Sequence, residues 1–393
     1  MTTTLRFSIA LAMVSALGPF SFDTYLPSFP SIATSMHTDI KDISLSVSLY
    51  VFGLALGQLS GGPLSDRWGR VRVMTAGLIL FSAASIFLIF SHSLTELLLG
   101  RAFQALGGGC CAVGVPAIIR DSAEGKEAAK LFSMVMLMMI IAPALAPSIG
   151  SLILSVAPWR AIFLFLAVYA LIVMLALRSW VFPTLAPPTQ QATKKISFLR
   201  SYLAVLKTPR AIAFVLLQTS TYCILLIFLT HASFIYQVWF HLSKFTFAGL
   251  FACNIAMMAL LNLSGRFLLR WLEPIQILTL AVFLQAIAVF AWLFFAWFNL
   301  SIIFIVPTIM VAIGCISVIS PNVQACYLLS FKENSATAAA LMGSMQLIIA
   351  GLVSLLSVFL ANNQLWPIAA VMAGCMLVAI GLMTRVWDME TPA

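Results

Sequence analysis

The sequence has very little charge: 8% of its 393 residues are Asp, Glu, Lys or Arg, whereas 62% are hydrophobic. Its mean hydropathy of +1.08 excludes an ordinary soluble domain. It also lacks any long polar region able to fold as a soluble domain. Apolar runs near twenty residues recur along the chain, and each can span a hydrocarbon core of about 30 Å. The composition therefore predicts a membrane protein.

The seven cysteines lack the spacing of a metal site. Cys110 and Cys111 are adjacent and the others lie in apolar runs, so we expect buried free thiols, no metal and no cofactor. The first apolar run lacks a convincing small-residue cleavage site, so we expect no cleavable signal peptide. The net charge of +9 does not indicate a nucleic-acid partner, because the basic residues are spread over short loops.

Twelve apolar stretches predict an all-α membrane protein with twelve transmembrane helices. The expected spans are residues 6–30, 43–61, 72–90, 94–118, 129–155, 161–181, 210–236, 245–268, 275–296, 299–322, 335–361 and 365–386. Between the sixth and seventh lies a Pro-, Gln- and Lys-rich stretch that is typical of a polar linker. It divides the chain into an N-terminal half (1–181), a linker (182–209) and a C-terminal half (210–393).

Nearly all of the 21 Lys and Arg residues fall on one side of this twelve-span plan. Lys41, Arg160 and Lys244 lie on the other side, and Arg101 lies inside a span. Because basic loops stay in the cytoplasm, both termini and the linker are predicted to be cytoplasmic. Two six-helix halves of this kind are typical of a secondary transporter built from repeats.

Asp23 lies inside the first apolar stretch, where an acid costs roughly 2.5–3.5 kcal/mol on insertion scales. An acid inside a membrane helix marks a functional site, and proton carrying is its leading role. Asp23 and Arg101 each lie about 11–12 Å from the outer end of their predicted helices, so we expect them at similar depth. Two interpretations stay open: a proton switch in a cavity that alternately hydrates and closes, or a static buried ion pair.

The loop after the second span reads Gly-Pro-Leu-Ser-Asp-Arg-Trp-Gly-Arg over residues 62–70. Its Gly62, Asp66, Arg67, Gly69 and Arg70 resemble the loop signature of the major facilitator superfamily. The resemblance implies the major facilitator fold, with two pseudo-symmetric six-helix halves, and it implies that this loop controls opening. The alternative is a solvated loop that only sets topology.

Two further helix motifs resemble those of the same family. Arg101 and Gln104 match its Arg-x-x-Gln-Gly motif, which is implicated in proton coupling. Pro143, Pro147 and Gly150 resemble its Gly-Pro-x-x-Gly-Gly exporter signature, in a softened form. Together these segments imply a transporter that exchanges its substrate for protons.

The segment Asp-Thr-Tyr-Leu-Pro, residues 23–27, resembles the Bcr/CflA drug-export subfamily, as does Arg120-Asp121. The resemblance implies a monomer in the bacterial inner membrane that exports small amphipathic drugs, chloramphenicol- or bicyclomycin-like, by alternating access. Its partners would be substrate, protons and lipid. A dedicated exporter of one siderophore, sugar or amino-acid derivative is the alternative. We expect no enzyme, because Gly343-Ser344 has no paired histidine.

Met and aromatic side chains on several spans form an adaptable apolar wall of the kind used by promiscuous binders. The predicted substrate cavity comprises Tyr25, Gln104, Met136, Met139, Tyr222, His231, Asn254, Met258, Met345 and Gln346. Each of them is also compatible with lipid contact or core packing. His231 either titrates or packs with a hydrogen bond.

Overall fold

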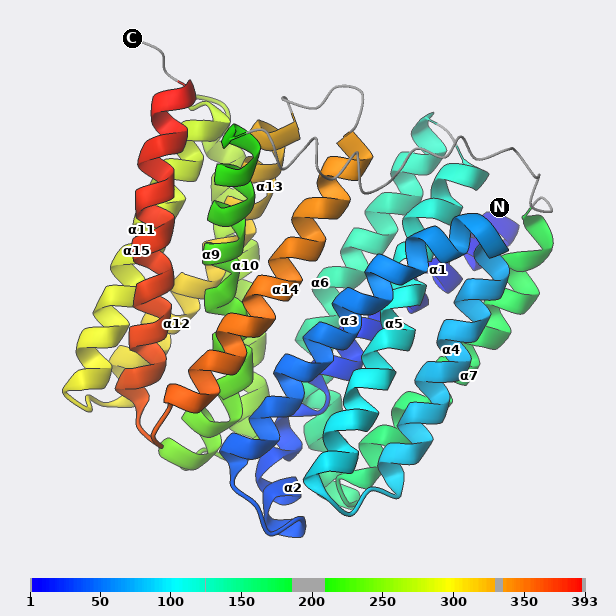
Figure 1. Cartoon of the computed structure of the whole chain (residues 1–393), viewed down its shortest axis with the longest axis horizontal. Coiled ribbons are helices and arrows are strands. Elements are labelled where there is room, and N and C mark those ends of the chain that lie inside the picture. The colour runs from blue at the N-terminus through cyan, green and yellow to red at the C-terminus, as the bar shows by residue number, and fades with distance from the viewer. Residues whose placement is uncertain (1, 124, 186–208, 329–334, 391–393) are drawn as a thin grey trace. The chain divides into compact units, whose positions relative to one another are not determined.

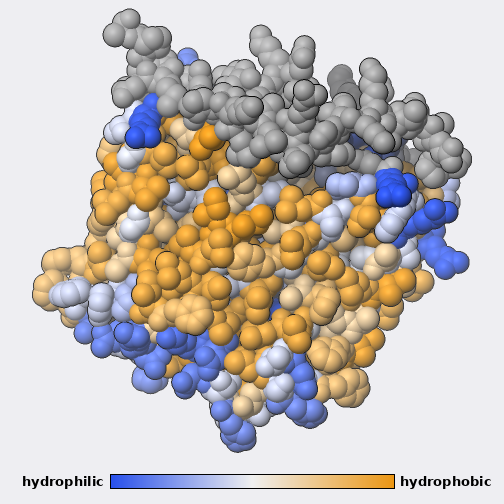
Figure 2. Space-filling view, in the orientation of Figure 1, coloured by the Kyte–Doolittle hydropathy of each residue, from blue (hydrophilic) through white to orange (hydrophobic). Residues whose placement is uncertain are grey.

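The computed structural model describes residues 2–123, 125–185, 209–328 and 335–390, which are almost wholly helical (Figure 1). These residues contain twelve helical stretches long and apolar enough to cross a membrane. Hydrophobic residues cover most of the face drawn in Figure 2, and hydrophilic residues gather along its lower margin. The prediction of an all-α membrane protein with twelve spans is therefore confirmed.

The first of two compact units comprises residues 1–191 and 236–251. Its complete elements are α1 (Thr2–Asp23), η1 (Leu26–Ser28), α2 (Phe29–Ser35), α3 (Ile40–Trp68), α4 (Arg70–Ile89), α5 (Leu94–Ser122), α6 (Gly125–Val156), α7 (Arg160–Trp180) and η2 (Phe182–Thr184). Most of the π-helix η3 (Phe234–Trp239) and the first turns of α10 (Lys244–Leu268) also belong to it.

The second unit comprises residues 192–235 and 252–393. Its helices are α9 (Pro209–Ser233), the rest of α10, α11 (Pro274–Trp297), α12 (Ile302–Gly314), α13 (Ile316–Leu328), α14 (Ser335–Leu360) and α15 (Leu365–Glu390). Residues 186–208 of the predicted linker lie outside the described residues. The division into halves at residues 182–209 stays a prediction.

The first span is broken, although we predicted one continuous helix over residues 6–30. α1 ends at Asp23, and the chain continues through η1 into α2. Pro27 and Pro30 stand in the first turns of η1 and α2, where a residue without an N–H group is tolerated. The carbonyl of Tyr25 accepts two hydrogen bonds from Ser28 at the break, one from its backbone N–H (3.0 Å) and one from its Oγ (2.6 Å).

The tenth span is also broken, between α12 and α13 at Cys315, where we predicted one helix over residues 299–322. Gln285 on α11 donates through Nε2 to the carbonyl of Ala312 (2.9 Å) beside this break. Further along, Pro321 has no N–H group to offer the carbonyl of Ser317, one turn earlier. The Nδ2 of Asn262 on α10 donates to that carbonyl instead (2.8 Å).

α5 lies against α3 and α4, and glycines allow the close approach (Figure 1). Gly53 and Gly57 on α3 face the backbone of α5, and a Cβ atom on either would collide with a carbonyl oxygen of α5. Gly107 on α5 is closed in by the backbone of α4 in the same way. Small residues at this spacing are how membrane helices bring their backbones together. This glycine seam, formed by Gly53, Gly57 and Gly107, fixes the position of α5 and of its one buried arginine.

A test of this seam replaces Gly57 with alanine. The new Cβ would meet the carbonyl of Leu106 and the Cα of Gly109, so we expect a loss of about 1–3 kcal/mol of stability from overpacking. Gly62→Ala on the same helix is the matched control, because a Cβ added there would have no neighbour within 4 Å among the described residues. Thermal unfolding in detergent measures both variants. Equal melting temperatures would contradict the proposed contact.

Candidate functional site

Arg101 on α5 is buried, with 1% of its surface exposed. Its guanidinium carbon lies 4.2 Å from the ring centroid of Tyr50 on α3 and 4.6 Å from that of Tyr25, in the turn before η1. A desolvated cation–π contact of this kind is worth about 2 kcal/mol. The charge therefore contacts two aromatic rings.

Hydrogen bonds fix the same guanidinium. Arg101 donates to the Oγ of Ser21 on α1 (3.1 Å) and to the Oε1 of Gln104, one turn further along α5. Gln104 donates in turn to the Oγ of Ser85 on α4 (2.7 Å), and Ser85 donates to the carbonyl of Phe81. A chain of polar groups thus links α1, α5 and α4 through Arg101.

Asp23 is the last residue of α1 and is 6% exposed. It forms no hydrogen bond or ion pair with any residue that the structure describes. The static ion pair with Arg101, one of the two interpretations left open by the sequence, is therefore not seen; the guanidinium instead contacts Tyr25, Tyr50, Ser21 and Gln104. Asp23, Arg101 and His231 are the buried side chains of ionisable Asp, Glu, Lys, Arg or His type in the described residues.

Gly150 of the predicted exporter motif packs against the break after Asp23. A Cβ atom at Gly150 would collide with the carbonyl oxygen of Thr24, so only glycine lets α6 approach this point. Pro143 and Pro147 lie within the same helix. The motif thus supports the turn that follows Asp23.

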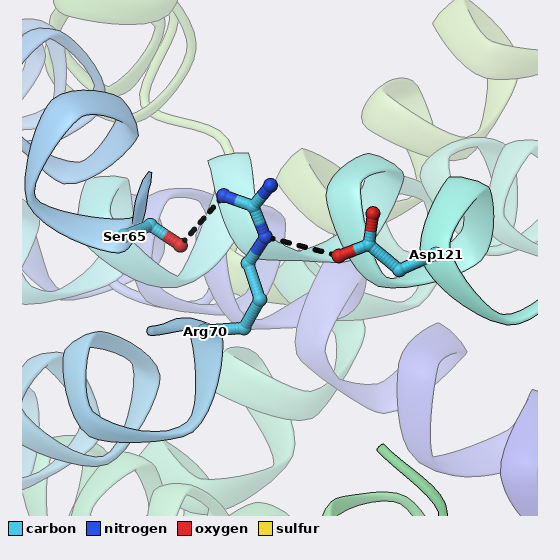
Figure 3. Close-up of polar contacts among 3 residues, drawn as sticks. All are labelled: Ser65, Arg70 and Asp121. Atoms are coloured by element: carbon cyan, nitrogen blue, oxygen red, sulfur yellow. Dashed lines mark hydrogen bonds and ion pairs between the residues drawn. The ribbon is translucent and has the colours of Figure 1, made fainter. Parts of the chain in front are cut away.

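The predicted gating loop is almost entirely helical. α3 runs to Trp68, α4 begins at Arg70, and Gly69 alone joins them with a φ of 89°, which favours glycine. Figure 3 shows Arg70 between two partners: its Nε lies 3.2 Å from an oxygen of Asp121 on α5, and it also donates to Ser65 (3.1 Å). Arg70 therefore ties the ends of α3, α4 and α5 together.

The other residues of this motif contribute fewer contacts among the described residues. Arg67 and Arg120 are exposed, and a Cβ added to Gly62 would have no described neighbour within 4 Å. The side chain of Asp66 lies outside the described residues. The loop's role in opening stays a prediction.

His231 is buried near the end of α9, and its Nε2 lies 2.9 Å from the Oγ of Ser357 on α14. Ser357 donates its one hydroxyl hydrogen to the carbonyl of Ser354 (2.6 Å), so Nε2 is the donor to Ser357. One residue earlier, Thr230 lies 2.6 Å from the Oγ of Ser354. His231 thus stabilises the contact between α9 and α14; whether it titrates stays a prediction.

Asn254 on α10 is 3% exposed, and neither its amide oxygen nor its amide nitrogen has a hydrogen-bond partner among the described residues. A buried amide in that state costs stability. The remaining predicted cavity residues differ in exposure: Met136 and Met139 are exposed, whereas Tyr222, Met258, Met345 and Gln346 are half-buried. Tyr25 and Gln104 contact Arg101 directly.

Tyr50, Ser21 and Ser85 surround the site but were not predicted from the sequence. A signal for Tyr50 was present: Ser46, Tyr50, Gly53 and Gly57 recur at helical spacing along one face of α3. Ser46 accepts or donates a hydrogen bond at the hydroxyl of Tyr25 (3.1 Å). The two serines carried no such pattern.

A sequence model of one protein family, described as "Major Facilitator Superfamily", matches residues 11–354. The chain belongs to the Major Facilitator Superfamily. This membership makes it a multi-pass membrane transporter rather than an enzyme.

This chain matches two curated relatives over less than half of its own length and less than half of theirs. The "Uncharacterized MFS-type transporter YdgK" of Bacillus subtilis (strain 168) is 36% identical over 178 residues, 44% of this chain and 44% of the relative. The "Multidrug resistance protein MdtL" of Escherichia coli (strain K12 / DH10B) is 35% identical over 170 residues, 43% of this chain and 44% of the relative. The chain therefore has multidrug-transporter homologues over part of its length.

Solved family structures share the fold over nearly the whole chain. The xylose transporter XylE from E. coli, in a partially occluded inward-open conformation, has a TM-score of 0.75 and 14% identity, with 100% of this chain and 98% of that chain covered. A crystal structure of a peptide transporter has a TM-score of 0.77 and 15% identity, with 98% and 94% covered. At such identities the likeness shows the major facilitator fold alone.

The contact between Arg70 and Asp121 can be measured with a double-mutant cycle of Arg70→Gln and Asp121→Asn. The side chains are 25% and 49% exposed, so we expect a coupling of about 0.2–1 kcal/mol that weakens in high salt. Melting temperatures in detergent at low and high salt give the coupling. Strictly additive effects at low salt would show that the ion pair does not form.

Proposed function

We propose that this chain exports small amphipathic compounds across the bacterial inner membrane in exchange for protons, as a monomer of the Bcr/CflA type with both termini in the cytoplasm. The observation that carries the proposal is Asp23: a buried carboxyl group without a described partner, at the break of the first span. The partial match to proteins named for multidrug resistance supports the direction and the substrate class.

The cost of burying a charge favours binding of a proton to the carboxyl of Asp23. An ionised carboxylate without a hydrogen-bond donor is unfavourable in an apolar interior, so the buried state favours binding of a proton. When the surrounding helices open and water enters, the charged form is solvated and the proton leaves. Each proton that crosses the membrane down the potential supplies about 2.3 kcal/mol of free energy per 100 mV.

Arg101 contributes a second buried charge to the same unit. Its guanidinium is held by rings and hydrogen bonds, so it keeps its place whether or not Asp23 is ionised. At the other end of α3, the contact of Arg70 with Asp121 stabilises the end of the helical unit and is proposed to break and reform during the cycle. Movement would be the rocking of two halves that is common in repeat-built transporters.

The substrate site is proposed to include Asn254, Met258, Met345 and Gln346, all of the second unit. Flexible thioethers adapt to differently shaped apolar groups. The two unpartnered amide atoms of Asn254 supply both a donor and an acceptor for a neutral substrate. The chain thus fits neutral, moderately apolar molecules that carry a polar group.

Asp23→Asn tests the proton role. The amide keeps the shape of the carboxyl but binds no proton, so substrate-dependent proton release from vesicles should fall at least tenfold while substrate still binds. Asp39→Asn is the matched control, since Asp39 is an exposed acid of the same unit. Full proton-coupled transport by Asp23→Asn, or transport that survives collapse of both the pH gradient and the potential, would refute the proposal. A substrate panel run on the same vesicles separates a multidrug exporter from a dedicated exporter of one metabolite.

Asn254→Leu tests the substrate site by separating stability from transport. Removal of an unpartnered buried amide should leave the melting temperature unchanged or raise it, while the KM for substrate rises several-fold. Asn262→Leu is the control on the same helix. It strips the carbonyl of Ser317 of its donor and should lower the melting temperature instead. An unchanged KM in Asn254→Leu would exclude this side chain from substrate binding.

A further inference from the structure

We propose that Tyr50 is a positioning residue that keeps Arg101 out of an ion pair with Asp23. The proposal rests on the proton role of Asp23 proposed above. One face of the Tyr50 ring lies 4.2 Å from the guanidinium carbon of Arg101. The same ring meets Phe22, the residue before Asp23, edge to face at 5.5 Å. Tyr50 is also near enough to both Arg101 and Asp23 to interact electrostatically with each.

The backbone of α3 fixes this ring. Gly53, one turn after Tyr50, touches the backbone of α5 at Ala102, next to Arg101. The hydroxyl of Tyr50 lies 4.0 Å from the point where a Cβ of Gly108 would stand. The hydroxyl lies near Ser21, whereas the ring makes the contacts with Arg101 and Phe22.

Tyr25 is the second ring in contact with the guanidinium, at 4.6 Å. Its hydroxyl is hydrogen-bonded to Ser46, one turn before Tyr50 on α3, at 3.1 Å. Both rings are therefore tied to α3. Their π faces attract the cation without neutralising it. Asp23 is left as a carboxyl group without a counter-ion, which is the state that a proton carrier needs.

No other described charged group on the helices around α1 takes the place of Arg101. α5, α6 and α7 pack against α1, and α3 meets it where Tyr50 contacts Phe22. On α5, Cys110 and Cys111 donate to the carbonyls of Gly57 and Met74, and on α7 Tyr169 donates to the carbonyl of Met13.

The charged side chains of these four helices, other than Arg101, are not buried where the structure describes them. They are Lys41, Asp42, Asp66, Arg67, Glu96, Arg120, Asp121, Lys126, Glu127, Lys130, Arg160 and Arg178, of which the side chains of Asp66 and Lys126 lie outside the described residues. Arg101 is therefore the buried cation from which Asp23 must be separated.

The test compares Tyr50→Phe, which keeps the ring, with Tyr50→Leu, which removes it. The readout is the infrared band of the protonated Asp23 carboxyl in protein reconstituted into bilayers at neutral pH, identified by its loss in Asp23→Asn. We expect the band to be retained in the parent protein and in Tyr50→Phe, and to fall several-fold in Tyr50→Leu, where the freed guanidinium pairs with the carboxylate. Adding Arg101→Gln to Tyr50→Leu should restore the band.

Three results would overturn the proposal: no Asp23 band in the parent protein, a full band in Tyr50→Leu, or a lost band that Arg101→Gln does not restore. If Tyr50→Leu does not fold, Tyr50→Met provides a second ring-free side chain for the same comparison. Because the band reports protonation without transport, it is independent of the vesicle assay. Normal proton-coupled transport by Asp23→Asn would refute the proposed proton role of Asp23. The infrared band would still decide whether Tyr50 keeps Arg101 from pairing with Asp23.

Discussion

The structure of the N-terminal unit depends on a buried guanidinium that has no described ion-pair partner. To hold it, α3 must come close enough to α5 to place the ring of Tyr50 on Arg101, which requires Gly53 and Gly57 at the seam. The chain must also turn after Asp23 so that Tyr25 reaches the same guanidinium. The glycine seam and the broken first span thus both serve to bring an aromatic ring to the buried charge of Arg101.

Much of the fold could be predicted because its causes are local. Apolar run length decides whether a segment spans a bilayer, so all twelve spans were found. The breaks were missed because their causes are distant in sequence. A broken membrane helix is stable only when other groups satisfy its freed carbonyls. In the tenth span, Gln285 bonds a carbonyl beside the break and Asn262 bonds the carbonyl left without a donor by Pro321, and both come from other helices.

The site was predicted in part for the same reason. Asp23 and Arg101 stand out because charge is rare in apolar runs, and the structure shows both buried in one unit. Similar depth was the basis for considering a pair, and depth does not specify which side chains each group contacts. Tyr50 is an ordinary residue of a membrane helix by composition. Only the packing of α3 on α5 gives it a role.

Gly69 has a mechanical consequence. A connection one residue long between α3 and α4 contains only two soft torsions, because the peptide bonds on either side are planar. The connection can therefore absorb little of a rotation of α3 about its own axis, and α4 must move with α3. Both helices also pack against α5, so a movement of any one of the three is transmitted to the other two.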